Sequence, residues 1–372
     1  MSAKILITGG AGFIGSHLAD ALLARGHDVR VFDNLSPQVH GEDASVPDYL
    51  SPDVEFVRGD VRDANALRRA LEGVDVVYHL AAMVGVGQSM YQIDDYTGVN
   101  DLGTATLLQL LIERPVKRLV VASSMSIYGE GLYEDETGAL VPNATRSAEQ
   151  LKKGQWEPVS TDGLPLTPVA TPESKQPELA SIYALGKYAQ ERMCLITGRA
   201  YGIPTTAMRF FNVYGTRQAL SNPYTGVLAI FASRLLNGKA PRIFEDGRQR
   251  RDFVHVKDVA RACADAMDRP ESAGHAINIG SGNIYTVEQI AATLARTMGR
   301  EDIAPEVTGE YRVGDIRHCF ADLTNAEKLL GFRPETGFDE GLSELVDWVA
   351  SQTAEDRVGE ADKELRQRGL VA

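Results

Sequence analysis

The chain has 372 residues and a net charge of −13 at pH 7, from 51 Asp and Glu against 38 Lys and Arg. This sign disfavours a general nucleic-acid binder, because phosphate backbones need a basic surface, although a few arginines suffice for a small anion. No run approaches the roughly 18 apolar residues of a membrane span, and the first residues enter a strand without signal-peptide features. Three scattered cysteines are too few for a disulfide framework or zinc cluster. We therefore expect a cytoplasmic protein with no metal, nucleic-acid or membrane partner.

The stretch AKILITGGAGFIGSHLADALLARGHDVRVFDN is typical of a strand, a glycine-rich turn, a helix and a second strand. The pattern predicts a strand over 4–8, a helix over 13–24 and a strand at VRVFD. The glycines of the turn permit a tight bend, close approach of a pyrophosphate, and close packing of helix on strand. They are Gly9, Gly12 and Gly15. Asp33 ends the second strand, where a carboxylate accepts the ribose hydroxyls of NAD and repels the phosphate of NADP, so we predict NAD.

Three further strands follow at regular spacing. VEFVRGDVRD places Asp60 and Val61 where they would flank an adenine ring, and VDVVYHLAA ends in Ala81 and Ala82, over which a cofactor can lie. VKRLVVASSMSIYG carries Ser124 at the end of another strand. Strands alternating with helices imply an α/β fold with a doubly wound parallel sheet. Ligands bind such sheets at the carboxyl ends of the strands, so Ser124 is expected to face the cofactor.

The segment SIYALGKYAQE places Tyr183 and Lys187 four residues apart, on one face of a helix. Alone, this spacing belongs more often to a surface helix, but after the glycine turn and the serine-bearing strand it indicates chemistry. A tyrosine pKa of about 10 must fall by about three units, or roughly 4 kcal/mol, to work near neutrality. One positive charge at about 5 Å supplies roughly 3 kcal/mol. We expect Lys187 and a nicotinamide ring to lower this pKa together.

Several motifs stand in a characteristic order over about residues 4 to 322: TGGAGFIGSHL, GDVRD, HLAA, SSMSIYGE, YALGK, RFFNVYGTRQ, RQRRDFVHVKDVA, NIGSG and RVGDIRH. Together they resemble the extended short-chain dehydrogenase/reductase family, in particular its nucleotide-sugar epimerases and dehydratases. The resemblance implies a Rossmann doubly wound parallel sheet with a smaller C-terminal substrate-binding lobe. It also implies NAD as cofactor and a nucleotide-diphosphate sugar as substrate.

The resemblance assigns roles to the candidate residues. Tyr183 would be the catalytic base, Lys187 would support it and hold the nicotinamide ribose, and Ser124 would hydrogen-bond the substrate hydroxyl. The candidate cofactor-binding residues are Gly9, Gly12, Phe13, Ile14, Gly15, Asp33, Asn34, Asp60, Val61, Leu80, Ala81, Ala82, Asn100, Ser123, Tyr183 and Lys187. The candidate substrate-binding residues are Ser124, Ser126, Gln88, Asn212, Arg251, Arg312 and Asp315. Of these, Asn212, Arg251 and Arg312 would contact the diphosphate, and Asp315 would lie near the nucleotide ribose.

The residues after Ser124 narrow the reaction. Similar sugar 4,6-dehydratases carry an Asp-Glu pair there, because elimination of water needs an extra acid and base, whereas this chain has Met125 and Ser126. Similar decarboxylases place a Glu at the position of Ser126, and 3,5-epimerising members use a Cys/Lys pair that the catalytic loops here lack. What remains is oxidation at C4 and re-reduction on the opposite face of the sugar, the reaction of a nucleotide-sugar 4-epimerase.

A dTDP-6-deoxyhexose such as dTDP-L-rhamnose is the leading substrate that the resemblance implies. An NAD(P)H-dependent 4-ketosugar reductase and a UDP-hexose 4-epimerase are the alternatives. A non-catalytic NAD-sensing protein would be expected to have lost Tyr183, Lys187 or Ser124, and all three are present. His255, within the apolar FVHV, is predicted to be a core histidine and not a catalytic one.

The predicted domains interleave along the chain. Residues 1–215 form the NAD-binding domain, with an insertion at about 130–180, and residues 216–350 form mainly the substrate lobe. The stretch at about 251–275 returns to the first domain. Residues 351–372 form a charged tail, expected to be a loosely attached helix or disordered.

The insertion is the main departure from the family pattern. It is rich in Pro, Thr, Ser and charge, with one short helical candidate over 147–153, so we expect a long irregular loop. Its ends must lie beside the active site, and Trp156 is placed to cap the sugar or base, or else to make a surface or subunit contact. The resemblance also implies a homodimer, formed through the helix of Tyr183 and a helix over 103–113.

Overall fold

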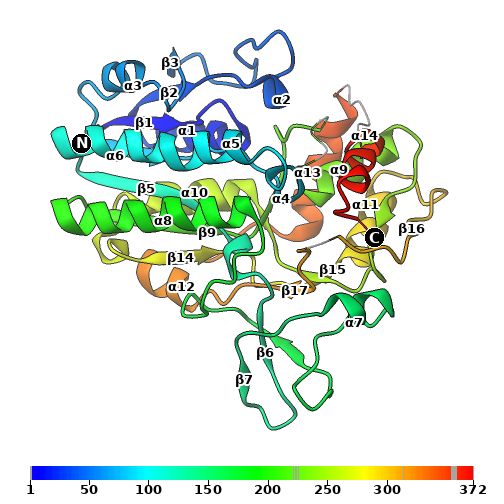
Figure 1. The fold of residues 1–372 in the computed structure, drawn as a ribbon. Coiled ribbons are helices and arrows are strands. Elements are labelled where there is room, and N and C mark those ends of the chain that lie inside the picture. Colours follow the sequence, from blue (N-terminus) through cyan, green and yellow to red (C-terminus); the bar gives the residue numbers. More distant parts are fainter. Residues whose placement is uncertain are drawn as a thin grey trace.

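The computed structural model describes residues 2–220, 222, 224, 226–312, 314–352 and 358–371. Its centre is a parallel sheet of seven strands in the order β14-β9-β5-β4-β1-β2-β3 (Figure 1). The strands are β1 (Lys4–Thr8), β2 (Asp28–Asp33), β3 (Glu55–Arg58), β4 (Val76–His79), β5 (Arg118–Ser124), β9 (Thr205–Phe210) and β14 (Ala276–Ile279). The predicted α/β fold with a doubly wound parallel sheet is confirmed.

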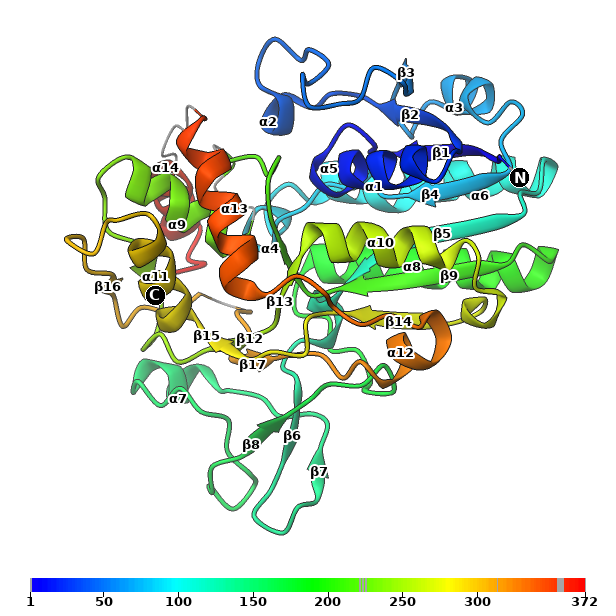
Figure 2. The ribbon, with the colours of Figure 1, turned by 180° about the vertical axis from the view of Figure 1, so that it is seen from behind.

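Helices cover both faces of this sheet. Successive strand residues point to opposite faces, so Ile5 and Ile7 of β1 pack on one side and Leu6 on the other. The first side carries α1 (Phe13–Ala24), α10 (Val256–Ala266) and α12 (Thr324–Leu330), which Figure 2 shows in front of the sheet. The other side carries α3 (Ala64–Ala70), α6 (Gly103–Glu113) and α8 (Ile182–Tyr201). The two apolar layers hold the strand ends, and hence the site, in place.

A smaller lobe, called the substrate lobe after its predicted role, lies beside the carboxyl ends of these strands (Figure 1). Its core joins α9 (Val227–Leu236), α11 (Val287–Thr297) and α13 (Phe338–Ala350). Short strands complete it: β10 (Asn212–Tyr214), β11 (Arg242–Ile243), β12 (Arg250–Arg251), β13 (Phe253–His255), β15 (Tyr285–Thr286), β16 (Glu306–Val307) and β17 (His318–Cys319). The chain returns to the main sheet through α10, and the return extends beyond residue 275 because β14 forms the edge strand. The three cysteines, Cys194, Cys263 and Cys319, are unpaired and buried in α8, α10 and β17.

The insertion is more ordered than expected. Strands β6 (Leu132–Glu134), β7 (Leu140–Val141) and β8 (Thr167–Val169) form an antiparallel sheet, drawn at the bottom of Figure 1. The expectation of a long irregular loop was therefore wrong, because strands of two or three residues give too little sequence pattern. The predicted helix is confirmed as α7 (Ala148–Lys152), whose N-cap Ser147 accepts a hydrogen bond from the amide of Gln150.

The tail is also better anchored than expected. Its described part contains α14 (Val358–Gln367), in which Ala361 and Leu365 are buried. Asp362 forms a 2.5 Å ion pair with Arg242, and the backbone of Val371 bridges that of Arg312. A helix was predicted correctly there, but not its attachment. Residues 353–357 and 372 lie outside the described part.

Short helical turns join the larger elements. They are α2 (Pro37–His40), α4 (Val86–Ser89), α5 (Ile93–Tyr96), η1 (Thr97–Leu102), η2 (Met125–Tyr128) and η3 (Pro270–Ser272). Among the described residues, every helix is too short or too polar to cross a bilayer.

Candidate active site

Helix α8 brings Tyr183 and Lys187 to one face, one turn apart, beside the end of β5. Both side chains are buried, and the ring of Tyr183 packs edge-on against Tyr96 at 6.5 Å between centroids. The start of the helix is fixed by the Ser89 hydroxyl, which accepts a hydrogen bond from the Tyr183 amide at 3.0 Å. The predicted pair therefore lies on the rigid part of the fold.

Ser124 lies at the end of β5 near Tyr183, and the interaction of its hydroxyl with the phenol acts to lower the pKa of Tyr183. Its oxygen also accepts hydrogen bonds from the amide of Ser126 at 3.1 Å and from the Ser126 hydroxyl at 2.9 Å. Because these two donors occupy its lone pairs, the Ser124 proton is directed toward Tyr183. Ser126, expected to contact substrate, thus also orients Ser124.

The protein surroundings of Tyr183 act on its pKa in two opposite directions. Burial raises this pKa, and the hydrogen bond with Ser124 acts in the opposite direction. Lys187 donates to the side-chain oxygen of Gln190 at 2.9 Å, and burial lowers its own pKa to about 8. Among the described residues, burial of the phenol therefore raises the tyrosine pKa, and its joint lowering by Lys187 and a nicotinamide ring stays a prediction.

The turn between β1 and α1 forms a cradle of backbone. Gly9 has φ +70°, and a Cβ there would lie 2.7 Å from the amide nitrogen of Ala81, while a Cβ at Gly15 would collide with the carbonyl of Gly9. At Gly12 the only described atom that a Cβ would meet within 4 Å is the Gly9 carbonyl oxygen, at 3.4 Å. Internal packing thus explains Gly9 and Gly15, whereas the space above Gly12 suits a close-lying pyrophosphate at the start of α1, where Phe13 and Ile14 begin the helix.

Asp33 ends β2 and Asp60 follows the end of β3, and both are predicted to contact the adenosine half of the cofactor. The carboxylate of Asp33 accepts hydrogen bonds from the amides of Ala11 at 3.1 Å and Leu35 at 2.9 Å. Asp60 accepts from Asn34 at 3.1 Å, and its side-chain hydrogen bond with Arg62 is the main cause that lowers its pKa to about 2. The low pKa of Asp60 keeps that carboxylate a charged acceptor, and the carboxylate of Asp33 ends β2, where the sequence predicts a contact to the ribose hydroxyls.

The loop after β4 completes the cradle. The side chain of Asn100 donates to the carbonyl of Met83 at 3.1 Å and accepts from its amide at 2.8 Å, which fixes the chain just after the half-buried Leu80, Ala81 and Ala82. Val61 is buried among the apolar residues under this loop.

Ser123 is oriented differently from its neighbour. Its hydroxyl donates to Glu191 at 2.7 Å inside the protein, because adjacent strand residues point to opposite faces. Its side chain is therefore engaged inside the protein, and the predicted cofactor contact would fall to its backbone.

The residues predicted for the diphosphate come together at the substrate lobe. Asn212 donates to the carbonyl of Asp252 at 2.8 Å, and Arg251 donates to the carbonyls of Ile316 and Arg317. These contacts hold both side chains on the β12–β17 side of the lobe.

Arg312 and Asp315 form an ion pair with N–O distances of 3.1 and 2.8 Å, and the guanidinium group of Arg312 lies over the ring of Phe244. Arg312 is therefore balanced by a carboxylate that its ligand would have to share.

Two other predicted residues lie inside the fold. Gln88 is buried and its side-chain oxygen accepts from Gln38 and from the Tyr96 hydroxyl. His255 is buried, as predicted for a core histidine, and its Nδ1 accepts from the amide of Lys257 at the start of α10.

Sequence reasoning missed a buried ion pair beneath the site. Arg209 in β9 makes a two-pronged contact with Glu191 in α8, at 2.9 and 2.7 Å, and also donates to Tyr128. The available signal was a charged arginine among the apolar residues of AMRFF, within a buried strand.

A second missed feature is a chain of buried hydrogen bonds behind Lys187. It runs from Gln190 to Thr104 at 2.8 Å, from Thr104 to His79 at 2.9 Å, and from His79 to Thr8 at 2.8 Å. Burial lowers the pKa of His79 to about 3, so its ring is neutral at physiological pH. The chain links α8 to β1 and keeps Lys187 in register with the glycine turn.

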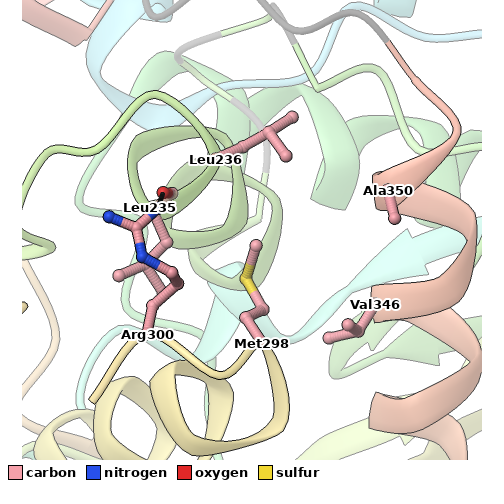
Figure 3. A pocket seen from close by; sticks show the side chains of 6 residues that line it. All are labelled: Leu235, Leu236, Met298, Arg300, Val346 and Ala350. Atoms are coloured by element: carbon pink, nitrogen blue, oxygen red, sulfur yellow. Dashed lines mark hydrogen bonds between the residues drawn. The ribbon is translucent and has the colours of Figure 1, made fainter. Parts of the chain in front are cut away.

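Two cavities lie away from Tyr183. One, of about 160 Å³, is set among α9, α11 and α13, where Arg300 donates to the carbonyl of Leu235 at 2.8 Å (Figure 3). The other, of about 580 Å³, separates β8 of the insertion from β12 and the start of α11. In the described part of the chain, no three His, Cys, Asp or Glu side chains converge to hold a metal ion.

Comparison with known protein families matches residues 5–150 and 162–280 to the NAD dependent epimerase/dehydratase family. The chain belongs to this family. It is accordingly an NAD-dependent nucleotide-sugar epimerase, with NAD as its cofactor. The space over Gly12 and the carboxylate of Asp33 fit that cofactor.

Individual members of the family resemble the chain over nearly its whole length. It is 35% identical over 353 residues to the dTDP-L-rhamnose 4-epimerase of Burkholderia thailandensis, covering 94% of this chain and 95% of that one. The structure of the Thermotoga maritima UDP-glucose 4-epimerase with UDP-glucose has a TM-score of 0.75 and 31% identity, over 93% and 98% of the two chains. That of the Thermus thermophilus UDP-glucose 4-epimerase with NAD has a TM-score of 0.73 and 31% identity, over 94% and 100%.

Proposed function

We propose that this epimerase interconverts the C4 epimers of a dTDP-linked 6-deoxyhexose such as dTDP-L-rhamnose. The observation that carries the proposal is the grouping of Tyr183, Ser124 and Lys187 at the end of β5 with no carboxyl group at the next two positions. Met125 packs into an apolar cluster and Ser126 binds Ser124. The site thus has one acid–base group and no second one for elimination.

The residues of the chain have separate tasks in this reaction. Tyr183 removes the proton of the C4 hydroxyl and returns it after the sugar has turned, while Ser124 donates a hydrogen bond that stabilises the phenolate. Lys187, held by Gln190, places a positive charge beside the cofactor ribose. Bound NAD supplies the acceptor and the donor of the C4 hydride. Arg251 and Arg312 offer guanidinium groups to the diphosphate.

A UDP-hexose is the second candidate substrate. The similarity to the two UDP-glucose 4-epimerase structures favours it, since their identity to this chain is close to that of the dTDP-L-rhamnose 4-epimerase.

The test is NMR of the purified protein with dTDP-L-rhamnose, UDP-glucose or UDP-galactose and no added NADH. We expect the C4 epimer of the dTDP sugar to appear, and Tyr183→Phe to lose about 10²–10⁴-fold in turnover while keeping its NAD. Conversion of the UDP sugars alone would replace the proposed substrate. NADH consumption with a 4-keto sugar and no epimerisation would indicate a ketosugar reductase.

We also propose that the protein is a homodimer. Leu185 and Ile196 lie on one face of α8 and are 47% and 58% exposed, and Leu102 at the start of α6 is 58% exposed. These apolar side chains on adjoining helices support pairing with a second copy.

A further inference from the structure

Arg146 lies in the insertion, but its guanidinium group reaches the substrate lobe. Nη2 donates to the carbonyl oxygen of Asp315 at 2.7 Å, and the carboxylate of Asp315 in turn pairs with Arg312 at 2.8 Å. The other nitrogens of Arg146 bind the carboxylates of Glu130 at 3.1 Å and Glu245 at 2.6 Å. Only 4% of the Arg146 side chain is exposed. Its hydrogen bonds are therefore made within the joint between the insertion and the substrate lobe.

The carboxylates of Glu130 and Glu245 fix the orientation of the guanidinium group that contacts Asp315. Glu245 is buried, has a backbone φ of +56°, and also pairs with Arg317 at 3.0 Å. A left-handed backbone is unfavourable for a glutamate, so the surroundings must hold this residue in one conformation. The planar fork of an arginine then leaves Nη2 only one direction.

The chain after Asp315 is held by its backbone in the same way. Arg251 donates to the next two carbonyls, and Glu130 accepts from the amides of Arg317 at 2.8 Å and His318 at 3.2 Å. The insertion thus contributes Glu130 and Arg146, and strand β12 contributes Arg251, to one rigid segment.

We propose that Arg146 is a positioning residue for nucleotide binding, so that the insertion sets affinity for the nucleotide half of the substrate. The inference rests on the proposed function, in which Arg312 contacts the diphosphate and Asp315 lies near the nucleotide ribose. Arg146 acts through Asp315 and does not touch Tyr183, Ser124 or Lys187 among its described contacts. It therefore governs binding and not proton transfer.

Trp156 extends the same contact. Its carbonyl accepts from Arg146 at 3.4 Å, and its ring packs against Tyr311, next to Arg312, at 6.5 Å between centroids. Trp156 thus lies at the nucleotide end of the site. Because the chain has only two tryptophans, the other being Trp348, it is also a local probe.

The test measures dTDP and UDP binding to the NAD-loaded protein by calorimetry, with Arg146→Met, Arg146→Lys and the exposed control Arg248→Met. We expect Arg146→Met to lower the affinity for both dTDP and UDP about tenfold or more. The affinity of Arg146→Lys should lie between that of Arg146→Met and that of the wild type. NAD content and kcat should stay within about twofold, with KM rising alongside Kd. Arg248→Met should match wild type, because Arg248 lines the larger cavity and not this joint.

Trp156 provides a second readout. In a Trp348→Phe background, dTDP titration should change the emission of Trp156, and Arg146→Lys should move the midpoint by the factor seen in calorimetry. Arg146→Lys keeps the buried positive charge, so its binding data suffice for the test if Arg146→Met does not fold.

Wild-type affinity for both nucleotides in folded Arg146→Lys and Arg146→Met would overturn the inference, as would a fall in kcat at unchanged KM. Failure of the proposed function looks different. The wild type would bind dTDP and the Arg146 variants would bind it weakly, yet no sugar would be epimerised.

Discussion

At the scale of single residues, Ser126 is the side chain whose role changed most between sequence and structure. In the sequence, Ser126 served only as evidence against dehydration and decarboxylation, because it stands where those reactions would need an acid. In the structure it donates to Ser124 twice, through its amide and its hydroxyl. The hydroxyl bond helps to direct the Ser124 proton to Tyr183, which stabilises the phenolate.

Ser126→Ala should therefore lower kcat about three- to tenfold, as expected for one hydrogen bond of roughly 0.5–1.5 kcal/mol. The amide of residue 126 still binds Ser124, so activity is not abolished. The alkaline optimum of kcat should move upward, because the phenolate loses part of its stabilisation. The measurement is a pH–rate profile beside the exposed control Ser343→Ala, and an unchanged profile would contradict the role.

His17 predicts how stability depends on pH. Burial is the main cause that lowers its pKa from 6.5 to about 4, followed by the charge of Arg217. Between these pH values the unfolded chain binds the proton and the folded protein does not, so the contribution is complete above about 6.5 and is lost as pH falls toward 4.

His17→Gln keeps a donor for the carbonyl of Thr216 and removes the titration. Between pH 7.5 and 5.0 the wild type should lose about 2 kcal/mol more unfolding free energy than this variant. Urea titrations at both pH values measure the difference. Equal losses would show that His17 does not titrate as its burial requires.

At the scale of elements, the turn between β1 and α1 contains two kinds of glycine. Gly9 and Gly15 are required by packing within the fold, whereas Gly12 is predicted to be required by the ligand. Gly12→Ala introduces a Cβ that meets only ordinary contact within the described chain, so the melting temperature without added NAD should stay close to that of wild type. The same methyl group occupies the space predicted for the pyrophosphate, so NAD affinity should fall about tenfold or more.

A matched control is Gly337→Ala, at the N-cap of α13, where no described atom lies within 4 Å of the added Cβ. Calorimetric NAD titration compares the three proteins. Full NAD affinity in Gly12→Ala would contradict the assigned cradle.

How far sequence reasoning reached also differs between elements. β1, α1 and α6 were predicted with their observed bounds, because apolar periodicity and glycines mark them. The outward turn of Ser124 and the inward turn of Ser123 follow from strand alternation once β5 is placed. Strands β6, β7 and β8 were missed, since two or three residues show no period. The contacts of Arg146 and α14 join residues far apart in sequence, which no local pattern reports.

At the scale of the whole molecule, α8 serves two surfaces. One face holds Tyr183 and Lys187, and another exposes Leu185 and Ile196. Ile196→Glu should convert the proposed dimer to a monomer, because a charge in an apolar interface is costly to desolvate. Sedimentation velocity measures the change, with the exposed Leu140→Glu of the insertion as control. A monomeric wild type would refute the dimer itself.

The reaction of the three buried cysteines with a thiol reagent would report local opening of the fold. Burial raises the pKa of Cys194 and of Cys319 to about 12, and raises that of Cys263 as well, so none presents a reactive thiolate in the closed fold. Each becomes available to a thiol reagent only when its surroundings part. Cys194 reports on α8, Cys263 on the opposite helical layer, and Cys319 on the segment beside Arg317. The labelling rate of each cysteine, resolved by mass spectrometry, would thus show which of the three regions opens most readily.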